Sequence, residues 1–286
     1  MGRLLPGLVG ICLLTVIAEG ATQEAVKTAP AAKKKVTMQY LDTPTGRWLV
    51  HDINRPAPPT VTPGDTPGAA PSDAIVLFDG TPKSMKNWTD GKFTDGKPNP
   101  VKWRFVADET PGQGYMESVK GGGYARTVEK FGSCQLHVEF ATPSRVRGSG
   151  QGRGNSGVFI QGQYEIQVLD SFDNKTYPDG QCAALYGRRV PLVNVCRKPG
   201  QWQSYDIIYH RPIFDENGKV TRRATFTVLH NGVLVQDHVE LEGGTGWRGP
   251  HAISPYEKHD DTGSIMLQDH GNPVLYRNIW IRPFKD

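Results

Sequence analysis

Two carboxylates that could perform acid–base chemistry, Glu165 and Asp170, follow a glycine-rich turn. The stretch reads GNSGVFI at residues 154–160 and YEIQVLD at residues 164–170. Side chains alternate along a β-strand, so Glu165 and Gln167 lie on the face opposite the apolar residues between them. We expect these two side chains to face a groove on a sheet. Asp170 reaches the same face only if a β-bulge adds a residue.

A second polar cluster lies near the C-terminus. Gln268 and His270 share a strand face, and His270 follows Asp269 directly. A histidine at a strand end can act as a general base, a general acid or a metal ligand. The Gly-Asn-Pro turn that follows predicts a hairpin from which the next strand returns. Arg277 and Asn278 on that strand are further candidates for substrate binding.

The same acidic and imidazole side chains leave a divalent metal ion possible. Carboxylates and histidine can ligate one ion, and acids in a loop can hold calcium. The first set is Glu165, Asp170, Asp269 and His270, and the second is Asp260 and Asp261. Neither set has diagnostic spacing, and the run from His259 to Asp261 is more typical of a solvated loop. A metal cofactor therefore stays open.

The elements that must position these residues are β-strands. Short segments with alternating or β-rich composition are separated by Gly, Pro, Asn and Asp. They are residues 74–78, 103–106, 115–119, 134–140, 157–161, 164–169, 204–209, 224–230, 233–240, 263–268 and 274–282. Eleven strands without a helical period predict an all-β fold, a two-sheet antiparallel β-sandwich of jelly-roll type. No internal repeat indicates a propeller or solenoid.

The chain divides into three parts by composition. Residues 1–20 are typical of a signal peptide, with Arg3 before a short apolar run, so we expect export to the periplasm or outside the cell and no stable membrane span after cleavage. Residues 21–73 form a linker and extended strap rich in Ala, Lys, Thr and Pro, with residues 40–53 docking on the domain. Residues 74–286 form the globular domain.

Charge and cysteine content narrow the function classes. The net charge of +4 is small for 286 residues and shows no basic stripe, so no nucleic acid is expected as a partner. An exported chain retains three cysteines, and an oxidising compartment permits a disulfide. Cys182 and Cys196 flank a loop-like stretch, and we expect them to pair. Cys134 lies in an alternating strand and is expected to be buried.

Four motifs together carry a family resemblance. They are GNSGVFI, YEIQVLD, LQDHGNPV and RNIWIRP, preceded by IVLFDG and Trp88. In this order they resemble the 3-keto-disaccharide hydrolase family of the concanavalin A-like lectin/glucanase superfamily, over about residues 74–283. The resemblance implies a β-sandwich that cleaves glycosides whose 3-hydroxyl is oxidised to a ketone. It also implies an oxidised saccharide as substrate and a sugar 3-dehydrogenase as upstream partner.

Such a substrate needs a base near C2, donors or a metal at the C3 oxygen, and an acid at the leaving oxygen. We expect Glu165 or His270 to be the base and Asp170 the acid. Hydrogen bonds to substrate are expected from Arg153, Asn155, Gln167 and Gln268. The Gly/Arg-rich loop at residues 145–153 and the segment 182–196 depart from the family pattern and are expected to rim the groove.

Two other functions remain open. A non-catalytic carbohydrate-binding, lectin-like module would present exposed aromatic platforms, for which Trp103, Trp247 and Tyr256 are candidates. A retaining, laminarinase-like glycosidase would need the carboxyls of Glu165 and Asp170 about 5 to 5.5 Å apart. An adhesion or scaffold role is a further alternative.

Overall fold

The computed structural model describes residues 38–110 and 112–284, which fall into two compact units divided after Pro59. In the first unit, β1 (Tyr40–Thr43) and β2 (Gly46–Leu49) form an antiparallel hairpin. Residues 40–53 are therefore not the extended strap that we expected, because Gly46, with a φ of +121°, lets the chain reverse. The predicted signal peptide and the linker up to residue 37 lie outside the described residues.

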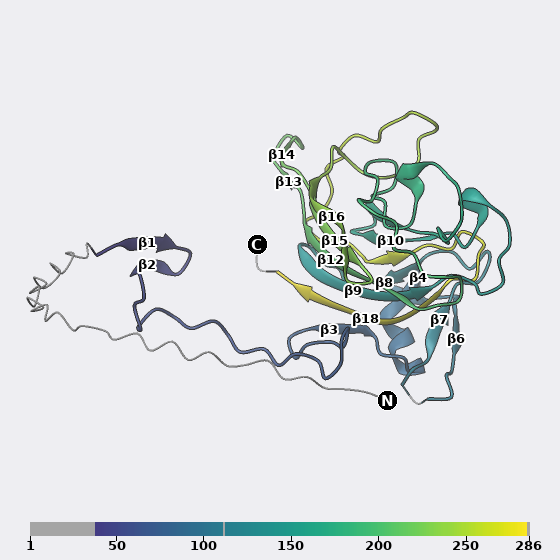
Figure 1. Ribbon diagram of the computed structural model, residues 1–286, viewed down its shortest axis with the longest axis horizontal. Coiled ribbons are helices and arrows are strands. Elements are labelled where there is room, and N and C mark those ends of the chain that lie inside the picture. The colour runs from purple at the N-terminus through teal and green to yellow at the C-terminus, as the bar shows by residue number, and fades with distance from the viewer. Residues whose placement is uncertain (1–37, 111, 285–286) are drawn as a thin grey trace, which may run out of the picture. The chain divides into compact units, whose positions relative to one another are not determined.

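The second unit contains two antiparallel sheets and confirms the all-β prediction (Figure 1). The six-stranded sheet has the order β11 (Tyr164–Val168), β10 (Ser156–Ile160), β17 (Met266–Leu267), β8 (Ala125–Thr127), β4 (Trp88–Thr94) and β5 (Lys97–Pro100). The eight-stranded sheet has the order β16 (Val233–Glu240), β15 (Thr225–His230), β12 (Gln203–His210), β9 (Cys134–Ala141), β18 (Leu275–Pro283), β7 (Tyr115–Glu117) and β6 (Arg104–Val106), and β3 (Ile75–Phe78) also pairs with β18.

Minor elements complete the unit. They are a small hairpin of β13 (Ile213–Phe214) and β14 (Val220–Arg222), and the 3-10 helices η1 (Pro82–Asn87), η2 (Gly150–Gly152) and η3 (Pro178–Gly180). All eleven predicted strand segments contain strands. In this unit the prediction missed β4, β5, β8, β13 and β14. Strands β4 and β5 contain Gly, Pro and charged residues, and the other three have only two or three residues each.

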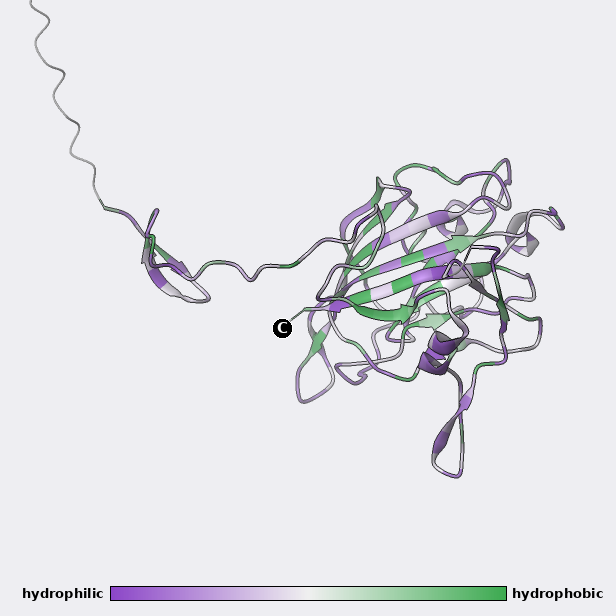
Figure 2. Cartoon of the chain, turned by 90° about the horizontal axis from the view of Figure 1, so that it is seen from below, coloured by the Kyte–Doolittle hydropathy of each residue, from purple (hydrophilic) through white to green (hydrophobic). Residues whose placement is uncertain are grey.

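Apolar side chains of the two sheets meet in one core. The Tyr164 ring of the six-stranded sheet lies 5.8 Å from the ring of Tyr209 and 6.1 Å from that of Phe226, both in the eight-stranded sheet. Figure 2 shows hydrophobic and hydrophilic residues alternating along strands of this unit. Burying such aromatic rings supplies much of the free energy that holds the layers together.

The predicted hairpin after His270 is wrong, because β17 and β18 belong to different sheets. Asn272 stabilises the crossing between the layers. Its backbone oxygen accepts a hydrogen bond from Ser118 Oγ at 2.6 Å, and its Oδ1 accepts one from the Gly154 amide at 2.8 Å. The Gly-Asn-Pro turn thus joins the two sheets. Through its bond to the Gly154 amide, Asn272 also holds the residues that lead into β10.

Cys134 is buried as expected, but the disulfide expected between Cys182 and Cys196 is absent. Cys134 is fully buried, as predicted. Cys182 and Cys196 are both free thiols and form no disulfide. Cys182 Sγ lies 3.0 Å from the hydroxyl of Tyr205, and Cys196 Sγ lies 3.6 Å from the Leu169 carbonyl oxygen. Both thiols therefore make polar contacts, Cys182 within the core and the partly buried Cys196 beside it.

Within the second unit, segment 60–72 packs on the sandwich as a strap. The carbonyl oxygen of Gly68 accepts hydrogen bonds from Asn278 Nδ2 and Trp280 Nε1, each at 2.8 Å. Ser72 and Thr62 are hydrogen-bonded to each other and close the segment into a loop. Within the described ranges, no helix has the length and apolar character that crossing a membrane requires.

Candidate active site

A cavity of about 420 Å³ lies on the face of the six-stranded sheet that points away from the core. Five predicted site residues line it: Asn155, Glu165, Gln167, Gln268 and His270. They come from β11, from the residue before β10 and from the end of β17, which are neighbouring strands. As the alternation in the sequence predicted, Glu165 and Gln167 lie on the face opposite the core, where this cavity is found.

Loops cover this face, so β10 and β11 are buried on both sides. The segment after Cys182 pairs with the free edge of β11, where the Gln167 amide donates to the Ala184 carbonyl at 2.9 Å. The Tyr186 amide donates to the Glu165 carbonyl at 3.2 Å. On the same strand, the Glu165 amide donates to Thr245 Oγ1 at 2.8 Å. These bonds bring Tyr186 and the 244–247 loop to the rim of the cavity.

Glu165 is the most strongly perturbed acid in the cavity. Its side chain is nearly enclosed, with 5% of the residue exposed. Burial disfavours the carboxylate and raises the pKa of Glu165 to about 8. Gly157 makes room for it, because a Cβ at this position would lie 2.4 Å from Glu165 Oε1. A carboxyl with a pKa near neutral pH can both take up and release a proton during a reaction.

Three amide side chains beside Glu165 present hydrogen-bond acceptors. The buried oxygens Asn155 Oδ1, Gln167 Oε1 and Gln268 Oε1 have no hydrogen-bond partner among the described residues. Their NH₂ groups are occupied, by the Gln151 carbonyl at 2.7 Å, by Gln151 Oε1 at 2.9 Å and by the Tyr124 hydroxyl at 2.9 Å, respectively. Buried acceptors without partners are costly, so a hydroxyl-bearing ligand would be stabilised here.

Asp170 and Arg153 lie outside the residues that line this cavity. Asp170 Oδ2 accepts a hydrogen bond from Arg153 Nε at 2.6 Å, and only 2% of the Asp170 side chain is exposed. Strands β10 and β11 pair in regular register up to Val168, without the bulge that we considered. Arg153 also donates to the Phe172 carbonyl oxygen at 2.8 Å, which ties the loop before β10 to the chain after β11.

Arg277 and Asn278 line a different cavity, together with strap residues. Both donate to the carboxylate of Glu139 on β9, at 2.7 and 2.8 Å. Burial lowers the pKa of the neighbouring His137, but the carboxylates of Asp206 and Glu139 outweigh it and raise that pKa to about 9. This ionic cluster belongs to the eight-stranded sheet and is separate from the cavity that contains Glu165.

Several lining residues were not among the predicted site residues: Tyr124, Gln151, Phe159, Tyr186, Gly246 and Trp247. Phe159 pairs with Glu165 across the strands, and alternation along β10 could have found it. Gln151 and Tyr186 lie in the two segments that we expected to rim the groove, which confirms that expectation. Of the three aromatic platforms considered, Trp247 is 66% exposed and lines the cavity. Trp103 is buried in the core, and the partly buried Tyr256 packs against the core and does not line this cavity.

Neither predicted metal-ligand set is assembled. No group of three or more His, Cys, Asp or Glu side chains suited to a metal ion occurs within residues 38–110 and 112–284. Asp269 accepts hydrogen bonds from the amides of Gly123 and Gly271, and Asp261 pairs with Arg211 at 2.6 Å. His270 is exposed at the cavity rim, with Glu165 as the single carboxylate among the described lining residues.

The sequence matches the model of the 3-keto-alpha-glucoside-1,2-lyase-like domain over residues 73–282, which contain both sheets and the whole cavity. The chain belongs to this family. Membership supports a role as a carbohydrate-active enzyme of the hydrolase or lyase type. No curated protein matches the chain.

Solved structures agree with this family assignment. A candidate glycosyl hydrolase from Parabacteroides distasonis ATCC 8503 is 41% identical, with a TM-score of 0.72, over 82% of this chain and 95% of that chain. A second candidate glycosyl hydrolase from the same organism is 16% identical, with a TM-score of 0.51, over 74% of this chain and 94% of that one. The second similarity shows the fold alone. Both similarities support the β-sandwich architecture of the second unit.

Proposed function

We propose that the protein cleaves glycosides whose 3-hydroxyl has been oxidised to a ketone. The observation that carries this proposal is the single carboxylate in the cavity, the buried Glu165 with a pKa of about 8. A retaining glycosidase uses two carboxylates about 5 to 5.5 Å apart, and Asp170 is instead held by Arg153 outside the cavity. A 3-keto substrate removes the need for that pair, because its C2 hydrogen is acidic.

The reaction then proceeds by elimination and hydration. Glu165 takes the proton from C2, and the C1–O bond breaks as a C1=C2 double bond forms in conjugation with the ketone. A proton delivered to the leaving oxygen releases the aglycone. Water adds at C1 and a proton returns to C2, so the net reaction is hydrolysis. Proton transfer by a positioned side chain contributes about 10²- to 10⁴-fold to such a rate.

Other cavity residues take supporting roles. The Tyr124 hydroxyl accepts a hydrogen bond from Gln268 Nε2, which leaves its own proton free for the C3 oxygen as negative charge develops there. His270 at the rim is the proposed acid for the leaving oxygen, in place of Asp170. The partnerless amide oxygens of Asn155 and Gln167 accept hydrogen bonds from sugar hydroxyls.

The substrate chemistry places the enzyme in a reaction sequence. A free sugar carries no 3-keto group, so a sugar 3-dehydrogenase must act before this protein. From the leader-like residues 1–20 we propose export to the periplasm or outside the cell. A divalent ion at the C3 oxygen is an alternative to Tyr124, and the amide oxygens together with Glu165 are hard ligands that would suit it.

A lectin-like module is the second candidate function. The exposed Trp247 beside unpaired amide acceptors is the combination that carbohydrate-binding proteins use, with a ring for stacking and polar groups for hydroxyls. The raised pKa of Glu165 favours the enzyme, because binding alone has no use for a carboxyl that titrates near neutral pH.

The test is product analysis by mass spectrometry. The protein is incubated with 3-keto-trehalose and with a 3-keto-β-glucoside, each with and without EDTA. Release of 3-keto-glucose, loss of at least 10²-fold in Glu165→Gln and full activity in the exposed control Glu129→Gln would support the proposal. Loss with EDTA would identify the metal alternative. Sugar binding without turnover of either substrate would favour the lectin-like module instead.

A further inference from the structure

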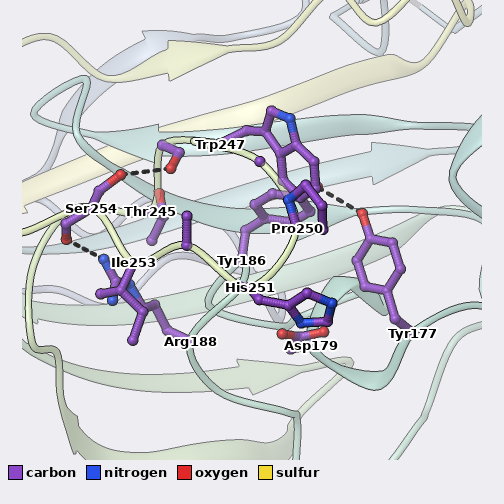
Figure 3. A pocket seen from close by; sticks show the side chains of 14 residues that line it. Tyr177, Asp179, Tyr186, Arg188, Thr245, Trp247, Pro250, His251, Ile253 and Ser254 are labelled. Carbon is purple, nitrogen blue, oxygen red and sulfur yellow. Dashed lines mark hydrogen bonds between the residues drawn. The ribbon is translucent and has the colours of Figure 1, made fainter.

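A second cavity, of about 500 Å³, adjoins the one that contains Glu165. The two share Tyr186, Gly246 and Trp247 as common wall residues. Figure 3 shows the side chains that line the second cavity, including Tyr177, Trp247 and Ile253. Because the walls are shared, a ligand whose sugar ring lies beside Glu165 can extend past Trp247 into the second cavity.

The walls of the second cavity are mainly aromatic and aliphatic. Tyr177, Tyr186 and Trp247 contribute rings, and Pro250 and Ile253 contribute aliphatic surface. Trp247 is 66% exposed and Ile253 is 65% exposed, so both present apolar surface that a ligand could cover. Covering such surface is favourable by the hydrophobic effect, and flat rings gain additional attraction from stacking on aromatic side chains.

Most polar groups of this cavity already have partners within the chain. Thr245 Oγ1 donates to the Gln163 carbonyl at 3.1 Å, and Ser254 Oγ donates to the Gly246 carbonyl at 2.7 Å. The hydroxyls of Tyr177 and Tyr186 bond to each other at 2.7 Å. The side chains of Asp179 and His251 and one guanidinium nitrogen of Arg188 are left without such a bond among the described residues. The first cavity, by contrast, has three amide oxygens that lack partners.

The loop that carries Trp247 is held at both ends. The guanidinium of Arg188 donates to the carbonyl oxygens of Gly244 and Ser254, which lie on either side of Trp247 in the chain. Ser254 also bonds to Gly246, as described above. These bonds fix the loop against the segment that pairs with β11, so Trp247 is a positioned wall between the two cavities.

We propose that the second cavity is the leaving-group subsite and that it takes an aromatic aglycone. The first cavity has unpaired amide acceptors beside Glu165, and the second cavity, beyond Trp247, is lined mainly by rings and aliphatic side chains. A ligand that matches both ends carries hydroxyls on one ring and a flat apolar ring on the other. This inference rests on the proposed function, because it names the group that leaves from C1. The preferred substrates are aryl 3-keto-glycosides.

The experiment compares phenyl and methyl 3-keto-α-glucosides, since a methyl group is too small to fill the second cavity. The readout is KM, because phenol is a better leaving group than methanol and would raise kcat for a chemical reason. Binding of unoxidised phenyl and methyl α-glucosides, which lack the ketone, is measured in parallel by Trp fluorescence. The variant is Ile253→Asp, and the control is Leu192→Asp, an equally exposed aliphatic residue at 64% that lines neither cavity.

We expect the phenyl compound to show a KM about tenfold lower than the methyl compound, corresponding to about 1.4 kcal/mol. Ile253→Asp should abolish this preference, whereas Leu192→Asp should keep it. Equal KM values, or a preference that survives Ile253→Asp, would overturn the subsite while turnover of the methyl compound still upheld the proposed function.

If neither 3-keto-α-glucoside is cleaved, and the 3-keto-β-glucoside of the functional test is not cleaved either, the proposed function fails. The binding data then decide the subsite separately. Tighter binding of phenyl than of methyl α-glucoside, lost in Ile253→Asp, would then support the second cavity as an aromatic-ring site. Equal binding of the two glucosides would overturn it.

Discussion

Replacing Glu165 with glutamine should change the pH dependence of stability. In the folded protein the pKa of Glu165 is about 8, because the carboxyl is buried, whereas 4.5 is its ordinary value. Between these values the folded state holds a proton that the unfolded state has lost. The free energy of unfolding of the wild type therefore falls as pH rises from 4.5 to 8, and above 8 the loss is complete.

The magnitude follows from the two pKa values. At about 1.36 kcal/mol per pH unit, the full difference corresponds to about 5 kcal/mol, and the part between pH 5 and pH 8 to about 3–4 kcal/mol. Glu165→Gln has a similar shape and no charge, so it escapes this loss. We expect the free energy of unfolding of the variant to gain about 3–4 kcal/mol on that of the wild type over that interval. Other groups titrate equally in both proteins and cancel in the comparison.

Urea denaturation followed by tryptophan fluorescence at several pH values measures this difference. In the same range, kcat/KM of the wild type for a 3-keto-glucoside should rise about tenfold per pH unit up to pH 8, because only ionised Glu165 can take the C2 proton. A stability difference that stays constant from pH 5 to pH 8.5 would refute the reasoning, since Glu165 would then not be a desolvated carboxyl.

Two further substitutions test how the site is held. Gly157→Ala should lower kcat/KM at least tenfold, because the new Cβ would displace the Glu165 carboxyl. Gly152→Ala is the control and should leave kcat/KM unchanged, because a Cβ at this position would meet nothing within 4 Å. Equal kcat/KM values of the two variants in a steady-state assay would contradict this prediction. Arg153→Ala should cost about 3–5 kcal/mol in urea denaturation by leaving the buried Asp170 unpaired, and adding Asp170→Asn should restore part of it. Wild-type stability of the single variant would show that this pair is not structural.

The sequence predicted the strands that carry the site, since alternation with period two is a local property of each segment. It also placed Glu165 and Gln167 on the outer face, because both lie on one short strand whose apolar residues must enter the core. It did not predict that β17 and β18 lie in different sheets, because a turn motif specifies a reversal but not the layer that the next strand joins.

The sequence by itself determined the fold class, the family and five of the residues that line the cavity, all of which follow from patterns within single segments. Only the tertiary structure decided that Asp170 pairs with Arg153, and that Arg277 and Asn278 bind Glu139 beneath a strap. It also decided that Tyr186 and Trp247 complete the cavity, because both are carried by loops that fold over β11. The pKa of Glu165 depends on that cover, since the desolvation of a carboxyl is set by everything packed around it.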